Sequence, residues 1–241
     1  MNEIIASLHR RKSVRAYLDK PISPEDKQAI LEAACQAPTV GNQQLYTIID
    51  VTDQELKNKL AVSCDNQPFI AAAPLVLIFC ADCRKWLKAY QEAGQAPRLP
   101  GAGDLLLAVT DAAIAAQNAV VAAESLGIGS CYIGDILEQC ETHQAMLRLP
   151  KYVVPAAMLI FGYPTEQQQN RPKPARCAMK HIVHENAYRD MDGAELREMF
   201  APRAGEKGFD DYMAAFCQRK YMSDFAVEMT RSVTAYLKDF E

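Results

Sequence analysis

The chain has 241 residues, of which 49% are hydrophobic and 23% charged, so it can form the core of one large domain. Its formal net charge of −4 lacks the basic balance of a nucleic-acid binder and does not suit an anionic membrane surface. We expect neither a secretory signal nor a membrane span, because the N-terminus has no apolar core and no run of about 18 apolar residues occurs. The eight scattered cysteines then indicate reduced thiols in the cytoplasm.

Apolar patterning and helix-boundary residues predict an alternation of helices and strands. Ser23 suits an N-cap, Pro24 the first position of the following helix, and Pro38 its end. The continuous apolar run 74–80 indicates a strand buried on both faces. In chain order we expect helices at 3–12 and 24–37, a strand at 45–51, a helix at 53–62, a strand at 74–80, a helix at 83–92, a loop at 94–103, a helix at 104–126, a strand at 130–133, a helix at 135–148, a strand at 154–161, a Pro-rich basic loop at 162–180, and helices at 192–200, 209–218 and 223–239.

The longest predicted helix is rich in alanine and ends before Gly127, a natural stop. Its apolar residues surround the helix axis, which predicts a central buried helix. Four polar residues interrupt it: Asp111, Gln117, Asn118 and Glu124. The helical last forty residues follow a Gly-rich break at 204–208, and they pack either on their own chain or across a dimer.

Two segments in the first fifty residues have the composition of a ligand site. Arg11, Lys12, Ser13 and Arg15 place three cations and a hydroxyl within five residues, a set that suits a phosphate. Taken alone, the same run is explained as a solvated basic helix end. The turn at 37–44 offers backbone N–H groups and amide side chains to a polar ligand, although a turn of this composition needs no function.

Two further segments lie in the second half of the chain. Gly134 ends a predicted strand after Tyr132 and Ile133, and a glycine there lets a planar ligand approach the backbone. A plain strand-to-helix turn explains this segment equally well. The loop at 171–176 presents three cations between stiffening prolines, and by itself it is a basic surface loop.

Other chemistries find no support in the sequence. Cys80 and Cys83 form a lone pair without a second pair or a nearby histidine, and the four histidines lack metal-ligand spacing, so we expect no metal. Gly127 and Gly129 end a helix instead of opening one after a strand, which argues against a dinucleotide fingerprint. No catalytic triad or carboxylate pair stands out.

The order of the motifs is more specific than any one of them. The series RRKSVRAY, APTVGNQQ, Gln67, CYIGD, FGYP with a basic Pro-rich loop, and IVHENAY resembles the FMN-dependent nitroreductase superfamily. The VHENAY segment at 183–188 and the helical C-terminus make the chain similar to the larger NADPH-type nitroreductase and flavin reductase group. The resemblance covers essentially all residues, 1–241.

The resemblance implies an α+β, nitroreductase-like fold with a central mixed sheet surrounded by helices. We expect a single domain over 1–241, with a helical C-terminal extension at about 190–241. The family pattern also implies an intertwined homodimer with two FMN sites at the subunit interface.

Site residues are carried over position by position. The resemblance implies that Gly41 and Arg231 contact NADPH or the substrate. It implies FMN contacts from one subunit at Arg11, Lys12, Ser13, Arg15, Gln67, Tyr132, Ile133 and Gly134, from the other subunit at Pro38, Thr39, Val40 and Asn42, and from the basic loop at Arg171, Lys173 and Arg176. The family often has His-Arg where this chain has Arg11-Lys12, and Lys-Pro-Arg where it has Lys173-Pro174-Ala175, so which arginine reaches the phosphate is open.

The implied activity is hydride transfer from NADPH, or NADH, through bound FMN to nitroaromatics, quinones or free flavins. No catalytic side chain is demanded, because the chemistry takes place on the flavin. The same fold with another acceptor, an activated C=C bond or a ferric chelate, is one alternative, and a product screen separates the two. A flavin-binding protein without catalysis is another, and it would hold FMN without oxidising a pyridine nucleotide.

Overall fold

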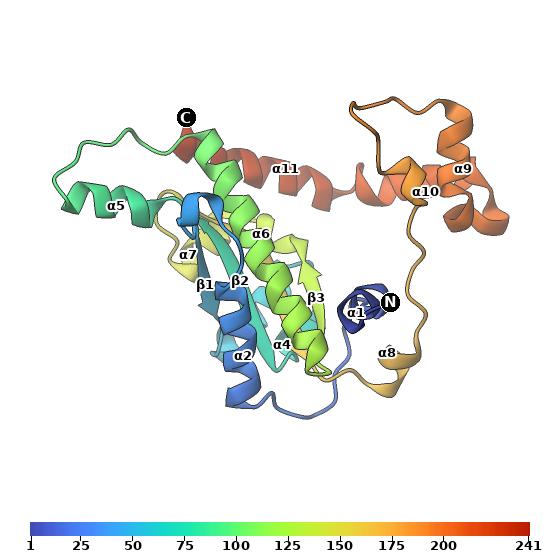
Figure 1. Ribbon diagram of the computed structural model, residues 1–241, viewed down its shortest axis with the longest axis horizontal. Coiled ribbons are helices and arrows are strands. Elements are labelled where there is room, and N and C mark those ends of the chain that lie inside the picture. Colours follow the sequence, from blue (N-terminus) through green and yellow to red (C-terminus); the bar gives the residue numbers. More distant parts are fainter. The chain divides into compact units, whose positions relative to one another are not determined.

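A computed structural model describes all residues, 1–241. The chain divides into two compact units. The first comprises Met1–Arg171 and Glu228–Glu241, and the second comprises Pro172–Val227. The first unit carries the sheet and most of the expected site residues, so it is described first (Figure 1).

The first unit is built on one four-stranded sheet in the order β1-β2-β4-β3. The strands are β1 (Tyr46–Asp50), β2 (Leu75–Asp82), β3 (Gly129–Ile133) and β4 (Val153–Gly162). All three neighbouring pairs are antiparallel. The expected mixed sheet is therefore antiparallel in its four strands, and a parallel direction enters only through an isolated bridge between Ser13 and Ser130.

Strand β2 is the central strand that its apolar run predicts, because every residue from Leu75 to Asp82 is buried. Successive side chains point to opposite faces of a strand. Leu75, Leu77 and Phe79 belong to the core on one face, and Val76, Ile78 and Cys80 to the core on the other. The sheet is thus packed on both sides.

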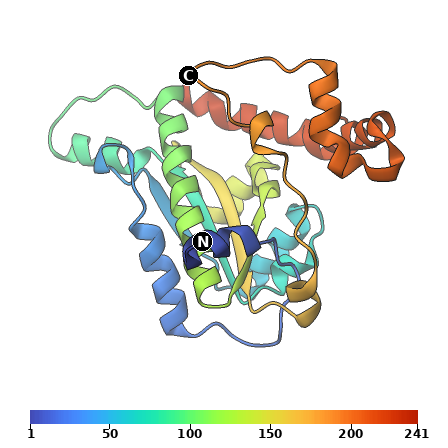
Figure 2. The same ribbon diagram turned by 45° about the vertical axis from the view of Figure 1, so that its right-hand side comes forward.

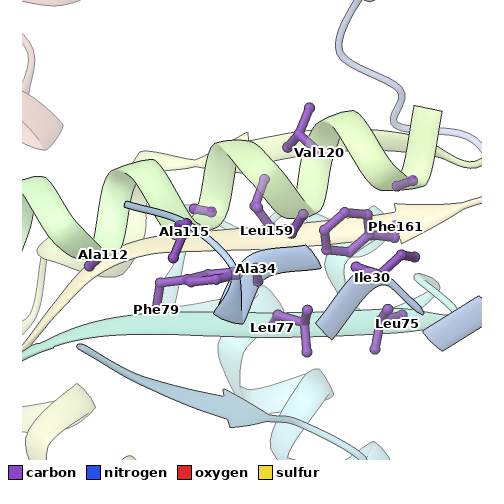
Figure 3. Packing of buried hydrophobic residues seen from close by; sticks show 14 of the residues in the cluster. Ile30, Ala34, Leu75, Leu77, Phe79, Ala112, Ala115, Val120, Leu159 and Phe161 are labelled. Carbon is purple, nitrogen blue, oxygen red and sulfur yellow. The ribbon is translucent and has the colours of Figure 1, made fainter. Parts of the chain in front are cut away.

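Helices α2 (Pro24–Cys35) and α6 (Ala102–Ser125) cover one face of the sheet. Figure 3 shows Ile30 and Ala34 of α2 and Ala115 of α6 packed against Phe79 and Phe161 of the sheet. The opposite face is covered by α3 (Gln54–Ser63), α4 (Pro68–Ala71) and the turn after β3. A third core cluster at one end joins α5 (Arg84–Glu92), the start of α6 and the end of the chain.

Helix α6 is only partly the buried helix expected from its composition. Its length and hydropathy also fit a membrane span, but nine of its residues are buried, mostly against the sheet and α2, as in a core helix. Two leucines on its other side stay exposed, Leu106 at 69% and Leu107 at 43%. One face of α6 therefore lacks a partner within the chain, which the all-round apolar pattern did not reveal.

Local signals explain most of the boundaries. Ser23 Oγ accepts a hydrogen bond of 3.0 Å from Asp26 N, with Pro24 in the first turn of α2 as expected. Gly127 follows α6 with φ +72°, a left-handed position that favours glycine. The helix expected at 135–148 is divided into a short 3-10 turn, Gly134–Leu137, and α7 (Cys140–Leu147), because Gln139 between them has φ 46°.

The remaining elements of the first unit are short or terminal. Helix α1 spans Glu3–Arg10, and a 3-10 turn at Val40–Asn42 precedes β1. Helix α8 (Glu166–Asn170) forms inside the expected loop because Thr165 Oγ1 accepts from Gln168 N. Helix α11 spans Asp224–Leu237 and belongs to this unit from Glu228 on, and a 3-10 turn, Lys238–Phe240, follows it.

The second unit contains α9 (Gly193–Ala204) and α10 (Phe209–Lys220), drawn in orange in Figure 2, with 3-10 turns at Met179–His181 and Gly205–Lys207. Asp192 caps α9 by accepting from Ala194 N and Glu195 N, both at 2.9 Å. Arg197 on α9 pairs with Asp210 on α10 at 3.0 Å.

Candidate functional site

The basic segment 11–15 lies along the free edge of β3. Val14 N donates to Ser130 O at 2.9 Å, and Ser13 bridges Ser130 in the parallel direction. Gly129 makes this close approach possible, because a Cβ there would lie 2.5 Å from Cγ2 of Val14. The segment therefore acts as an extra edge strand, which places its charged side chains at one side of the sheet.

Residues 169–171 are hydrogen-bonded to the same segment. Lys12 Nζ donates to Gln169 O at 2.6 Å and to Arg171 O. In return, Arg171 Nη2 donates to Ser13 O at 2.6 Å. The ammonium of Lys12 is thus used largely within the protein, whereas Arg171 is brought directly beside the basic segment.

Two arginines at this edge keep buried donors without a protein acceptor. Arg11 has its Nε and Nη2 in this condition, and Arg171 has its Nε. A buried guanidinium N–H without an acceptor is costly, since most buried polar groups in proteins are paired. Arg11 also lies near Tyr132, whose pKa is raised to about 12 by burial and partly lowered again by the arginine. The geometry suits an anion that accepts from both arginines.

Arg15 lies close to α4, the helix that begins after Gln67. The Arg15 guanidinium lies 5.9 Å from the ring centre of Phe69, two residues after Gln67. Gln67 is half-buried at the start of α4, and its Nε2 donates to Cys64 O at 2.7 Å. The structure therefore brings these two expected residues into one neighbourhood, with the Gln67 side-chain carbonyl left for a ligand.

The end of β3 offers backbone to a ligand. The Ile133 side chain is buried in the core, while Gly134 is exposed and a Cβ on it would meet nothing within 4 Å. Tyr132 is 36% exposed, and its hydroxyl donates to Gln117 Oε1 of α6 at 3.3 Å. A flat ligand has free access to the backbone at Gly134.

The second expected set, residues 38–42, lies next to β1, on the other outer strand of the sheet. Pro38, Gly41 and Asn42 are exposed, and Thr39 and Val40 are half-buried. Three inter-strand spacings of about 4.8 Å separate the two outer strands. One chain therefore does not bring this set together with the basic segment.

Lys173 and Arg176 belong to the second unit, where Lys173 is half-buried and Arg176 exposed. The VHENAY segment of that unit forms a tight turn. His184 Nδ1 accepts from Arg189 N at 3.1 Å, Asn186 has φ 64°, and the rings of His184 and Tyr188 lie 5.6 Å apart.

Arg231 on α11 is engaged by carboxylates. Its Nη1 and Nη2 donate to the two oxygens of Glu141, both at 2.8 Å. Its Nε and Nη2 donate to Glu228 at 2.9 and 2.8 Å. The pairing with Arg231 lowers the pKa of both Glu141 and Glu228 to about 2. A ligand that binds this arginine has to compete with these carboxylates.

Sequence reasoning missed two polar residues of α6 that shape these neighbourhoods. Asp111 is fully buried and accepts from the backbone of residues 40 and 45, and Gln117 accepts from Tyr132. Both were noted only as interruptions of an apolar helix. A lone carboxylate in such a helix needs buried partners, and that requirement was the available signal.

Comparisons with known proteins agree with the motif order. Residues 8–163 match the model of the nitroreductase family. The chain is 31% identical over 238 residues to FMN reductase [NAD(P)H] of Bacillus subtilis, covering 98% of this chain and 91% of that one. It is 35% identical over 192 residues to the oxygen-insensitive NADPH nitroreductase of Salmonella typhimurium, covering 80% and 77%. The solved structure of B. megaterium NfrA1 superposes with a TM-score of 0.83 at 31% identity, covering 98% of each chain.

Proposed function

The chain belongs to the nitroreductase family, and from this premise we propose that it is an NAD(P)H-dependent FMN oxidoreductase of the nitroreductase and flavin reductase type. It takes hydride from NADPH and delivers it through FMN to nitroaromatics, quinones or free flavins. The observation that carries the proposal is the pair of arginines, Arg11 and Arg171, with buried donors that no protein atom accepts.

These donors fit the phosphate of FMN. Phosphate oxygens accept charge-assisted hydrogen bonds from guanidinium groups, often in pairs. Lys12 and Ser13 stand beside the two arginines, and Lys12 already holds the 169–171 backbone in place. We assign Arg171 as the member of the 171–176 loop that meets the phosphate in this part of the site, with Lys173 and Arg176 as further cations of the loop.

We place the flavin ring along the end of β3. Gly134 and the backbone of Ile133 would hold the ring, with Tyr132 beside it, and Gln67 and Arg15 would bind at its polar edge. A cation at that edge stabilises negative charge on the reduced ring, which is preorganised electrostatic stabilisation. Arg15 is better placed for this role than Lys12, because Lys12 donates to two carbonyl groups.

Bound FMN supplies the hydride-accepting and hydride-donating chemistry, so the protein needs no nucleophile or general base. The side chains bind and orient. Gly41, next to Asn42, borders the acceptor. Arg231 attracts the anionic cosubstrate, after exchanging at least one of its carboxylate partners, Glu141 and Glu228.

We also propose a homodimer in which residues 38–42 of one subunit complete the site of the other. The two halves of the site lie on opposite outer strands of the sheet, so two copies are needed to join them. The exposed leucines of α6, Leu106 and Leu107, supply apolar surface for the contact.

The eight unpaired cysteines support a cytoplasmic location.

Subunit contact is tested by a charge on α6. Leu106→Arg is expected to convert the dimer to a monomer in light scattering and to abolish FMN retention, because half of each site is lost. Val62→Arg is the matched control, since Val62 is 64% exposed on α3, across the sheet. A Leu106→Arg protein that remains a dimer contradicts the assignment of this face.

The function itself is tested by the visible spectrum of the purified protein. We expect a yellow protein, or one that becomes yellow with added FMN, whose flavin band bleaches when NADPH is added without oxygen. A colourless protein that takes up no FMN refutes the proposal. Comparable kcat/KM for NADH removes the NADPH preference, and a product screen with an activated alkene and a ferric chelate tests the other acceptors.

A further inference from the structure

The turn between α2 and β1, residues 39–45, holds an unfavourable backbone conformation. Gly41 has φ 55°, Asn42 has φ 57° and Gln44 has φ 51°. Glycine adopts the left-handed region freely and asparagine tolerates it, so the unfavourable position is that of Gln44. Such a conformation persists only where surrounding structure holds it, and it concentrates at ligand sites.

Asp111 of α6 holds both ends of this turn. Its Oδ1 accepts from Val40 N at 3.0 Å and its Oδ2 accepts from Leu45 N at 3.1 Å. The residue is fully buried, with 0% of its surface exposed. Burying a carboxylate is costly unless its oxygens are paired. The packing of α6 does not itself require a carboxylate at this position, so the role of Asp111 lies in these two hydrogen bonds.

Two more side chains close the turn from other directions. Thr39 Oγ1 accepts from Gln44 N at 3.2 Å. The Trp86 indole of α5 donates from Nε1 to Gln43 O at 2.7 Å. The polar groups on the inner side of the turn are thereby satisfied within the chain, while Pro38, Gly41 and Asn42 stay exposed on its outer side.

We propose that Asp111 is a positioning residue for FMN in the partner subunit's site, acting through the backbone of Val40 and Asn42 without touching the flavin itself. The inference rests on the proposed function. A turn already held in its bound form loses little conformational freedom on binding, and preorganisation of this kind raises affinity. Trp86 of α5 holds the same turn through its hydrogen bond to Gln43 O.

Asp82, whose N–H donates to Leu45 O at 2.9 Å, provides a nearby control for the loss of a buried carboxylate charge. It is also buried, at 8% exposed, and it also accepts from two backbone N–H groups, Arg84 N at 3.0 Å and Lys85 N at 3.1 Å. Its turn leads into α5 and carries no expected FMN contact. At Asp82 both N–H groups donate to Oδ1, whereas Oδ2 accepts from Thr47 Oγ1 at 2.6 Å, so Asp82→Asn keeps the oxygen that the backbone uses and removes the charge. Asp111→Asn removes the charge together with one of the two backbone acceptors.

The experiment compares Asp111→Asn with Asp82→Asn by FMN fluorescence titration of the apoprotein and by urea unfolding, with dimer content checked by light scattering. Both variants are expected to unfold at lower urea. Only Asp111→Asn is expected to weaken FMN binding, by about tenfold, and to alter the shape of the flavin absorption band. Equal FMN dissociation constants for the two dimeric variants overturn the inference while leaving the proposed function intact.

Trp86→Phe is a second variant in case Asp111→Asn does not fold. It keeps an aromatic ring on α5 but removes the donor to Gln43, and it is expected to weaken FMN binding about threefold. Unchanged affinity in a folded Trp86→Phe dimer likewise contradicts the inference. A wild-type protein that binds no FMN refutes the proposed function, which is a separate outcome.

Discussion

The two outer strands of the sheet carry opposite kinds of polar chemistry. Beside β3, Arg11 and Arg171 keep buried donors that the protein leaves without acceptors. Beside β1, the inner backbone groups of the 39–45 turn are taken up by Asp111, Thr39 and Trp86. The β3 edge supplies cationic donors for a ligand, and the β1 edge supplies a turn whose conformation is fixed before binding. A site assembled from both edges gains charge from one subunit and rigidity from the other.

The largest effect is expected at Arg11, on the β3 edge. Arg11→Gln is expected to weaken FMN binding about a hundredfold, because charge-assisted hydrogen bonds to the phosphate are lost. The measurement is a fluorescence titration of the apoprotein. Arg10→Gln is the control, since Arg10 is exposed and pairs with Glu3 at 2.6 Å. Similar losses in both variants would mean that the β3 edge attracts the flavin only by general charge.

A second prediction concerns the close fit of the basic segment against β3. Gly129→Ala forces a Cβ to within 2.5 Å of the Val14 side chain, which is branched and stiff. We expect a loss of about 1–3 kcal/mol in the free energy of unfolding, together with weaker FMN binding. Gly193→Ala, where a Cβ meets nothing within 4 Å, is expected to change stability by less than about 0.5 kcal/mol. Denaturant titration that finds the two variants equal would contradict this packing.

A pH dependence is expected near the β3 edge. Burial, with the carboxylates of Asp135, Asp65 and Glu228, raises the pKa of Glu138 from 4.5 to about 7. The folded protein therefore holds this proton more tightly than the unfolded chain, so the contribution to stability is present below pH 4.5 and is lost as the pH rises through 7.

Glu138→Gln removes that dependence. Between pH 5 and pH 8 the wild-type Tm is expected to fall by about 5 °C more than that of the variant. Glu141→Gln should keep the wild-type profile, because the pKa of Glu141 is lowered to about 2 by Arg231 and does not change over this range. Parallel melting curves for wild type and Glu138→Gln would show that this carboxyl does not titrate there.

The smallest expected effect lies away from both edges, at Arg231. Glu141→Gln frees one side of its guanidinium and is expected to lower the KM for NADPH about twofold, while Arg231→Ala raises it a few-fold, since exposed ion pairs are weak. Steady-state kinetics with saturating acceptor measures both. No change in either variant would leave Arg231 as a purely structural contact between α11 and α7.

Most elements were predictable because their signals are local. Ser23 and Pro24 begin α2 as expected, and the apolar run of β2 is the buried central strand. The prediction was wrong where the backbone conformation of a single residue decides whether a helix continues. The helix expected at 135–148 is interrupted at Gln139, whose left-handed φ has no sequence signature like that of glycine. Helix α8 was missed because prolines and charge dominate the composition around it.

The sequence by itself determined the family and the cofactor class, and it predicted the positions along the chain where a ligand is met, because those follow from residue types in a fixed order. Only the tertiary structure decided which charges are free to act. Lys12 and Arg171 bind each other's segments from 159 positions apart, and Asp111 reaches a turn 66 to 71 positions away. Whether a polar group is satisfied or waits for a ligand depends on such distant neighbours, and no local pattern encodes them.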